Sequence, residues 1–208
     1  MAVPDPPHDR PALRVLLVRH GESTWNAVGR WQGQADPPLS RRGRAQARAA
    51  AVGLPPLGLV VASDLARARE TAGLLAAPHG YDVRIDDGLR ERDAGGFTGL
   101  TRPEIHLRYP GAVQTGDAFR PPEGWEPDAA VLERAWRSLD CIADGSAGTV
   151  VAVTHSGVIH AVEHALGTPR ARIANLEGRW IDRRNGDWVA GERQLLVDPR
   201  LATRPPTP

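Results

Sequence analysis

The sequence predicts an α/β protein with three layers, in which helices cover both faces of a mostly parallel central sheet. Three stretches each join a short β-branched apolar run to a polar loop and then to a helical pattern: "LRVLLVRHGES", "LGLVVASDLARARETAGLLA" and "GTVVAVTHSGVIHAVEHALG". Strands that alternate with helices favour parallel pairing and helices on both faces. Asn185-Gly186, between two strand-like halves, predicts a hairpin that adds antiparallel strands at one edge.

The predicted strands of the parallel part are short and apolar. They cover residues 13–18, 59–61, 83–85 and 150–153. The last of them precedes a helix that follows Gly157 and ends near Gly167. Each of these strands is expected to lie in the middle layer.

Three further helices are predicted from apolar residues at helical spacing. Ser40 caps the first of these helices, which ends at Gly53, while Ser63 or Asp64 caps the second and Pro127 lies near the start of the third. Their expected buried stripes are Ala45, Ala49 and Val52; Leu65, Ala68, Ala72 and Leu75; and Val131, Ala135, Leu139 and Ile142.

Composition limits the class of protein. The 208 residues are 41% hydrophobic and carry a formal net charge of +1, so one globular domain is expected and no global basic field favours nucleic acid. The single cysteine excludes an internal disulfide framework and suits a reducing compartment. With neither a signal-peptide pattern nor an apolar run of membrane-spanning length, a cytoplasmic protein with no membrane partner is expected.

The domain organisation follows from two proline-rich ends. We expect a disordered N-terminal tail over residues 1–12, a single domain over 13–198 and a flexible C-terminal tail over 199–208. Within the domain, the proline- and glycine-rich segment at about 100–126 is expected to form a small lid insertion.

Polar side chains follow the predicted strands where each strand ends. Arg19 and His20 leave the first strand, the segment with Arg67 follows the second, Glu91 lies in a loop after the third, and His155 follows the last. Ligands of open α/β sheets bind outside the carboxyl ends of the strands. Two histidines, two arginines and a glutamate are therefore expected to meet at one edge of the sheet.

Five blocks of sequence carry a resemblance to a known family. "LVRHGESTWN", "GRWQGQADPPLSRRGRAQA", "SDLARARETA", "LRERDAGGFTGL" and "VTHSGVIHAVEHALG" occur in the order seen in the histidine phosphatase superfamily, which contains cofactor-dependent phosphoglycerate mutases and many phosphomonoesterases. The resemblance implies that His20 becomes phosphorylated and that Glu91 donates a proton to the leaving oxygen. The residues expected to bind the phosphoryl group or line its pocket are Arg19, Gly21, Ser23, Asn26, Arg67, His155 and Ser156.

The residue types suit this chemistry. His20 must be neutral to attack, and two nearby arginines with a second histidine cation are expected to lower its pKa from about 6.5. The forks of Arg19 and Arg67 match phosphoryl oxygens bidentately. Gly21 lets the backbone approach closely. A carboxylic acid at Glu91 can protonate the leaving oxygen and then activate water as a base.

One competing motif points to a metal. "HAVEH", His160 to His164, fits the H-x-x-E-H pattern of certain zinc proteases, and the two histidines share a helix face. The pattern is short and a third ligand is not obvious. The resemblance to the histidine phosphatase superfamily implies neither a metal ion nor an organic cofactor for a phosphatase of this group.

The sequence favours a phosphatase over a mutase. The segment after the acid block is short and lacks the adjacent basic pair typical of mutases of this family, although "RERDAGGFTGL" resembles the mutase version. We expect a phosphoric monoester hydrolase of the histidine acid type. Its partner would be a small phosphorylated metabolite, with Arg102, Arg108 and Arg120 suggesting a second anionic group. Phosphoglycerate mutase activity, a non-catalytic phospholigand-binding module and a homodimer remain open.

Overall fold

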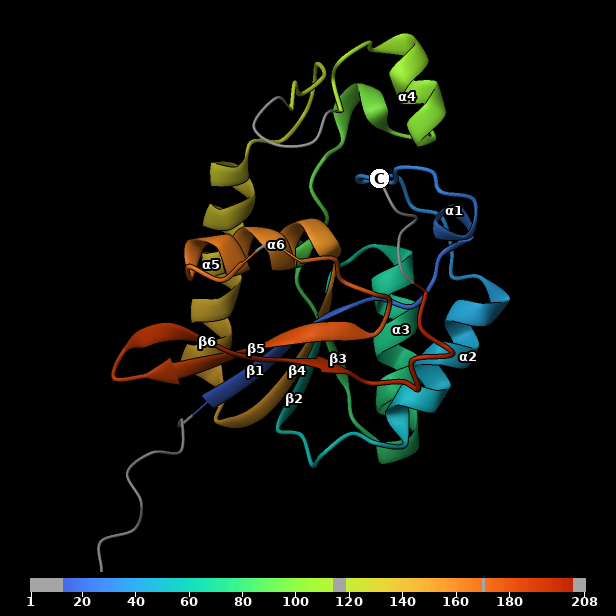
Figure 1. Ribbon diagram of the computed structural model, residues 1–208. Coiled ribbons are helices and arrows are strands. Elements are labelled where there is room, and N and C mark those ends of the chain that lie inside the picture. Colours follow the sequence, from blue (N-terminus) through green and yellow to red (C-terminus); the bar gives the residue numbers. More distant parts are fainter. Residues whose placement is uncertain (1–12, 114–118, 170, 204–208) are drawn as a thin grey trace, which may run out of the picture.

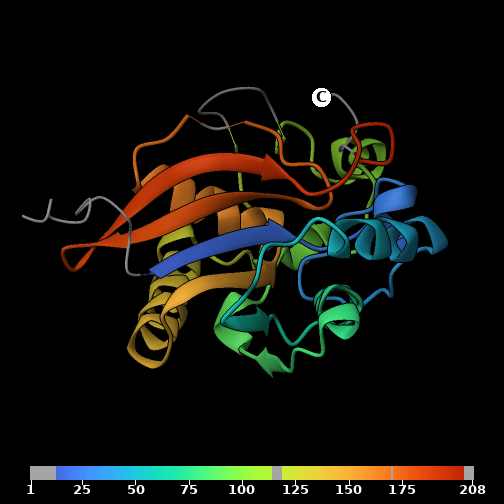
Figure 2. The same ribbon diagram turned by 90° about the horizontal axis from the view of Figure 1, so that it is seen from below.

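Six strands form one sheet in the computed structural model, which describes residues 13–113, 119–169 and 171–203. The order is β3-β2-β4-β1-β5-β6, and β1 to β4 are parallel, while β5 pairs antiparallel with β1 and β6 with β5. Figure 2 shows β4, β1, β5 and β6 side by side in this order. Their bounds are β1 Leu13–Arg19, β2 Leu59–Ala62, β3 Val83–Ile85, β4 Gly148–Thr154, β5 Glu177–Arg184 and β6 Asp187–Leu195.

The predicted hairpin is confirmed. Asn185 and Gly186 join β5 to β6 with φ of 51° and 88°, the left-handed values that a tight two-residue hairpin turn requires. The antiparallel strands lie at one edge of the sheet, as expected.

The helices form the two outer layers, which confirms the three-layer prediction. α2 and α3 pack on one face and α5 and α6 on the other, and Figure 1 shows these pairs on opposite sides of the molecule. Along β1, Val15 faces α5 and α6, whereas the next residue, Leu16, faces α2 and α3. The helices are α1 Thr24–Ala27, α2 Arg41–Ala51, α3 Ala66–Ala76, α4 Arg102–Arg108, α5 Asp128–Gly145 and α6 Ser156–Ala165, with 3₁₀ turns at Ala77–His79, Asp87–Leu89 and Gly95–Phe97.

The prediction of which residues of α2 are buried is wrong, because the buried face is shifted by one residue along the helix. Ala45, Ala49 and Val52 are exposed, Val52 by 87%, and the buried face instead includes Gln46. The alanines of this helix occur on both faces, so they do not fix its rotation. A polar contact does, because the Gln46 side-chain oxygen accepts from the backbone N–H of Glu22, 2.9 Å away.

The other helices agree better with the sequence. The stripes predicted for α3 and α5 are buried, and Pro127 is the N-cap of α5. The expected cap of α3 is wrong, because the N-cap is Leu65 and the backbone N–H of Ala66 donates to Asp36 from another segment. α6 begins at Ser156 rather than after Gly157.

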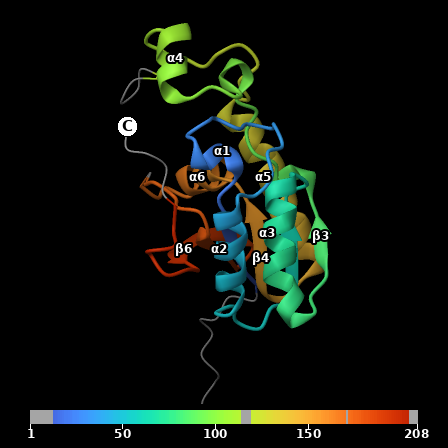
Figure 3. The same ribbon diagram turned by 90° about the vertical axis from the view of Figure 1, so that its right-hand side faces the viewer.

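The segment expected to form a lid has its own small apolar cluster. Phe97 and Ile105 are fully buried there and pack with Trp31 and Trp125. α4 stands apart from the layers of the sheet in Figures 1 and 3. Residues 114–118 of this segment lie outside the described residues, and its role as a lid stays a prediction.

The expected tails are only partly described. Residues 1–12 and 204–208 lie outside the described residues. Within 199–203, Gln46 Nε2 donates to Leu201 O over 2.7 Å and Thr203 Oγ1 donates to Glu22 Oε2 over 2.7 Å. Among the described residues, no helix combines the length and the apolar character needed to cross a membrane.

Candidate active site

The parallel strands end together, as the sequence predicts. Arg19 pairs with Thr154 across β1 and β4, and Ala62 pairs with Val153 across β2 and β4. The residues that follow these ends, including His20 and His155, therefore emerge at the same edge of the sheet.

The His20 ring is held in one orientation by two contacts. Its Nδ1 lies 2.6 Å from Gly21 O, and its Nε2 lies 3.2 Å from Arg67 Nε. A carbonyl oxygen can only accept and a guanidinium N–H can only donate. The proton of the neutral ring is therefore on Nδ1, and the lone pair is on Nε2.

Arg67 is fully buried on α3 and bridges separate segments. Its Nη1 donates to Ala35 O over 2.8 Å and its Nη2 to Gly33 O over 2.9 Å. Burial, opposed by the charge of Glu91, lowers the pKa of Arg67 to about 10. The guanidinium remains charged at neutral pH beside Nε2 of His20.

Two buried nitrogens at this edge have no hydrogen-bond partner among the described residues. One is Nε of Arg19, whose Nη1 donates to Ile173 O over 2.8 Å, and the other is Nδ1 of His155, whose Nε2 lies 2.9 Å from Ser63 Oγ. Arg19 is 5% exposed, and burial lowers its pKa to about 10. An unpaired buried polar group is costly, so Nε of Arg19, which can only donate, marks a place for an acceptor, and Nδ1 of His155 marks another when it carries the ring proton.

The two imidazoles are neighbours, with ring centroids 5.1 Å apart. Burial first, and then the charges of Arg67 and Arg19, hold the pKa of His20 well below its usual range, as the sequence predicts. Burial and Arg67 lower the pKa of His155 in the same way. The expectation of a second histidine cation is therefore wrong, because His155 is as buried as His20.

Glu91 is held between two backbone N–H groups. Its Oε1 accepts from Arg92 N over 2.8 Å and its Oε2 from Gly157 N over 3.2 Å, with Ser156 Oγ at 3.5 Å. A Cβ at position 157 would lie 2.2 Å from Glu91 Oε1, so any other residue there would displace the carboxyl group. The charge of Glu91 acts to raise the pKa of both Arg19 and Arg67, so its carboxyl group lies within electrostatic range of both cations.

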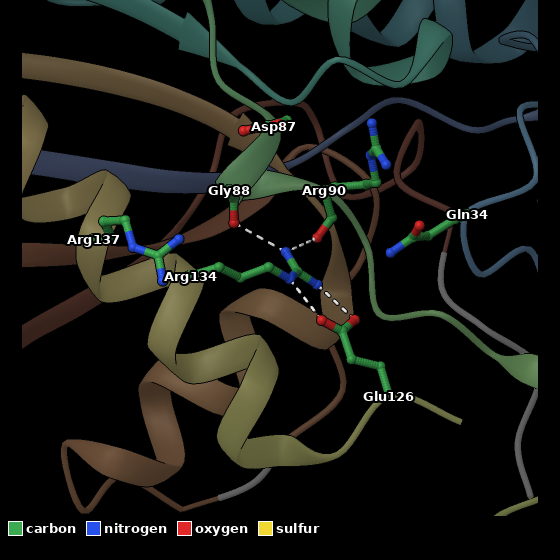
Figure 4. Close-up of a pocket in the computed structure, with 7 residues that line it drawn as sticks. All are labelled: Gln34, Asp87, Gly88, Arg90, Glu126, Arg134 and Arg137. Atoms are coloured by element: carbon green, nitrogen blue, oxygen red, sulfur yellow. Dashed lines mark hydrogen bonds and ion pairs between the residues drawn. The ribbon is translucent and has the colours of Figure 1, made fainter. Parts of the chain in front are cut away.

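Side chains that line a pocket beside the site hold the loop that carries Glu91. Figure 4 shows Arg134 between the Glu126 carboxylate and the carbonyl oxygens of Gly88 and Arg90. Gln34 Nε2 donates to Glu91 O over 3.2 Å from the same side. None of the residues that line this pocket was predicted as a site residue, and Arg134 makes four hydrogen bonds within the protein.

Three predicted site residues have structural partners. A Cβ on Gly21 would lie 2.7 Å from Gly43 O, which explains the glycine by a contact with α2. Ser23 caps α1, with its hydroxyl accepting from Asn26 N and donating to Gln32, and Asn26 Oδ1 accepts from Ser23 N. Their contact with a ligand stays a prediction.

Sequence reasoning missed three supporting residues. Ser63, placed after the second strand and as a possible cap but not among the site residues, lies beside His155. Thr71 accepts from Gly21 N over 3.0 Å, and Asn175 Nδ2 donates to His20 O over 2.8 Å. Ser63 follows β2 directly, and Thr71 lies one helical turn after Arg67, so both positions held a usable signal. Asn175 held none, because its contact spans 155 residues of chain.

The competing zinc motif has a different explanation. Glu163 is buried and its carboxylate pairs with Arg179 and Arg193. Within the part of the chain that the structure describes, no cluster of three or more histidine, cysteine or acidic side chains could hold a metal ion.

Buried cations and imidazoles at the carboxyl ends of parallel strands are typical of α/β enzymes that act on phosphate esters. The chain belongs to the histidine phosphatase superfamily (branch 1), whose profile matches residues 15–190. This confirms the resemblance seen in the sequence, and the chain is an enzyme, a phosphatase of this superfamily.

Individual relatives agree with the family. A glucosyl-3-phosphoglycerate phosphatase of Mycolicibacterium vanbaalenii is 39% identical over 89% of this chain and 88% of its own. A probable phosphoglycerate mutase of Enterobacter sp. is 34% identical over 86% and 88%. The solved structure of a mycobacterial glucosyl-3-phosphoglycerate phosphatase complexed with VO3 has a TM-score of 0.78 at 32% identity, covering 86% of this chain and 96% of that one.

Proposed function

We propose that the chain hydrolyses a small phosphate monoester through a phosphohistidine intermediate on His20. The observation that carries this proposal is the hydrogen-bonded ring of His20, whose Nε2 lone pair faces Arg67 among buried, positively charged groups. Such a nitrogen is an activated nucleophile, and its surroundings favour an anion.

The proposed first step transfers the phosphoryl group to the ring. The Nε2 lone pair of His20 attacks phosphorus, the bond to the ester oxygen breaks, and that oxygen takes a proton from the Glu91 carboxyl group. Arg19 and Arg67 stabilise the charge on the equatorial oxygens. The Ser63 hydroxyl donates to His155 Nε2, which leaves Nδ1–H of His155 to bind a third oxygen.

The proposed second step releases inorganic phosphate. A water oxygen attacks phosphorus, its proton goes to the Glu91 carboxylate, and the N–P bond breaks so that the electron pair returns to Nε2. Glu91 thus acts first as acid and then as base. Apart from the substrate and the attacking water, this chain's own residues supply the groups that these steps use.

The proposed substrate carries a second anionic group, such as the carboxylate of a phosphoglycerate derivative. A relative that is 39% identical is named a glucosyl-3-phosphoglycerate phosphatase, and the lid segment supplies Arg102, Arg108 and Arg120. Membership of the histidine acid type, a cytoplasmic location and a homodimer stay predictions.

The test of the function is hydrolysis of p-nitrophenyl phosphate in the presence of EDTA. We expect activity that orthovanadate blocks and that His20→Ala lowers by at least about 10³-fold, because the nucleophile is gone. Activity lost to EDTA and restored by zinc would contradict the proposal. A panel with glucosyl-3-phosphoglycerate and 3-phosphoglycerate then tests the substrate class.

The second candidate is phosphoglycerate mutase activity. It is favoured by the relative of 34% identity that is named a probable mutase. Conversion of 3- to 2-phosphoglycerate that 2,3-bisphosphoglycerate stimulates, faster than release of inorganic phosphate, would replace the hydrolase with the mutase.

A further inference from the structure

The turn of residues 171–176 holds both Arg19 and His20. Ile173 O accepts from Arg19 Nη1 over 2.8 Å, and the backbone N–H of Leu176 donates to Arg19 O over 3.0 Å. Asn175 Nδ2 donates to His20 O over 2.8 Å. The position of this turn therefore sets where the Arg19 guanidinium and the His20 backbone lie.

The start of this turn is held by Arg193 on β6. Its Nη1 donates to Arg172 O over 2.8 Å and its Nη2 to Ala171 O over 3.0 Å. The rigid fork of one guanidinium group thus fixes two successive carbonyl groups, just before Ile173.

Arg193 is itself fixed by Glu163 on α6, whose side chain is 1% exposed. Arg193 Nε lies 2.8 Å from Glu163 Oε1, and Nη2 lies 2.6 Å from Oε2. Burial opposes the charge on Glu163, but the neighbouring side chains of His160, Arg193 and Arg179 outweigh burial and lower the pKa of Glu163 to about 2. The Glu163 carboxylate therefore stays charged at all but strongly acidic pH and holds Arg193 in place.

We propose that Glu163 and Arg193 form a clamp that positions Arg19 for the phosphoryl group. The clamp fixes residues 171–172, the turn carries Ile173 O to Arg19, and Arg19 binds the ligand. Glu163 and Arg193 are positioning residues, because they act through Arg19 and do not touch the phosphoryl group. The clamp proposal rests on one part of the proposed function, which is that Arg19 binds an oxyanion.

Arg179 offers a matched control. It also pairs with Glu163, with Nε 2.7 Å from Oε1, but its Nη1 donates to Gly191 O in β6. Lysine at position 179 or 193 keeps the charge beside Glu163 and loses the fork. Only Arg193→Lys also removes the bonds to the turn.

The experiment measures orthovanadate binding by calorimetry, together with kcat/KM for p-nitrophenyl phosphate. We expect Arg193→Lys to weaken vanadate binding and lower kcat/KM by about tenfold, since misplacement of a positioning group is costly, while Arg179→Lys changes both by less than about twofold. A merely structural role would lower the active fraction without changing the vanadate Kd. Glu163→Asp, which shortens the anchor, is expected to weaken vanadate binding as well and carries the test if Arg193→Lys does not fold.

A double-mutant cycle tests whether the clamp acts through Arg19. In an Arg19→Ala background, Arg193→Lys should cause no further loss of vanadate affinity, because coupled residues are not additive. Equal effects of the two lysine variants, or additivity with Arg19→Ala, would overturn the clamp. Wild-type protein that binds vanadate without hydrolysing the ester would contradict the proposed function alone, and wild-type protein that binds no vanadate would overturn both.

Discussion

Two buried charged centres of this protein are built in opposite ways. At the carboxyl ends of the parallel strands, here called the strand edge, Arg19 and Arg67 lie beside two imidazoles. Arg19 Nε and His155 Nδ1 have no partner among the described residues. Around Glu163, one buried carboxylate is matched by the guanidinium groups of Arg179 and Arg193. Glu91 lies near both cations of the first centre, but Nε of Arg19 and Nδ1 of His155 stay without partners there. In the second centre, both oxygens of the Glu163 carboxylate accept hydrogen bonds from the arginines.

The difference distinguishes a binding site from a structural one. A compensated buried charge stabilises the fold as long as both partners are present, because removing one leaves the other buried and unpaired. Buried donors without partners cost stability, and a bound anion satisfies them. Activity should therefore depend most strongly on the residues at the strand edge, and stability most strongly on Glu163.

The largest effect on activity is expected from Arg19→Ala. We expect kcat/KM for p-nitrophenyl phosphate to fall by about 10²–10³-fold, because a preorganised charge donor to the transition state is lost. The free energy of unfolding should change by less than about 1 kcal/mol, since the bond from Arg19 to Ile173 O is offset by removal of a buried cation. Urea unfolding measures the second quantity, and a large loss of stability would break the comparison.

Glu163→Gln should show the opposite balance. We expect the free energy of unfolding to fall by about 3–5 kcal/mol, because two arginines lose their buried partner. Per folded molecule, kcat/KM should fall by only about tenfold, through the displaced turn. Urea unfolding and active-site titration with vanadate separate the two effects, and a variant as stable as wild type would contradict this account of Glu163.

Gly157→Ala tests the carboxyl group at the strand edge. The new Cβ would lie 2.2 Å from Glu91 Oε1 and must displace the carboxyl group. We expect kcat to fall by about 10–10²-fold for an alkyl phosphate, whose leaving oxygen needs the proton, and by less for p-nitrophenyl phosphate. Gly73→Ala is the control, because a Cβ at position 73 meets nothing within 4 Å. Equal losses for the two esters would exclude Glu91 as the acid.

The smallest expected effects are two separate losses of stability with falling pH. His20 and His155 have lowered pKa values when folded, so the unfolded chain binds protons that the folded chain does not, and stability falls below about pH 6.5. Glu163 has a pKa of about 2 in the folded chain, against 4.5 for a free side chain. Its contribution to the free energy of unfolding is therefore complete above about pH 4.5 and is lost as the pH falls toward 2. This loss is at most about 3 kcal/mol.

Urea unfolding across the acid range resolves these two losses. His20→Ala should reduce the first loss, because it removes one of the two histidines that titrate there, and Glu163→Gln should remove the second. If Glu163→Gln altered the loss near pH 6 instead, the assignment of the two windows to the two centres would be wrong.

The strand-edge site could be predicted because its main residues directly follow strands or lie in the first turn of a helix. The continuous apolar runs show where β1 and β4 end, and parallel pairing then brings His20 and His155 to one edge. The rotation of α2 could not be predicted, because alanines cover both of its faces and Gln46 decides the phase through a bond to Glu22.

The supporting contacts lay beyond the sequence for another reason. Glu163 belongs to a motif that resembles a zinc site, and nothing local indicates that Arg179 and Arg193, from β5 and β6, cover its carboxylate. Likewise, Asn175 reaches His20 only because β5 pairs with β1. Such partners are fixed by the tertiary fold and not by spacing along the chain.

A crystal structure of the protein with orthovanadate tests the central claim most directly. The account predicts vanadium bonded to Nε2 of His20, with its oxygens bound by Arg19, Arg67 and Nδ1 of His155. Vanadate bonded to Nδ1 of His20, or bound away from these four side chains, would contradict it.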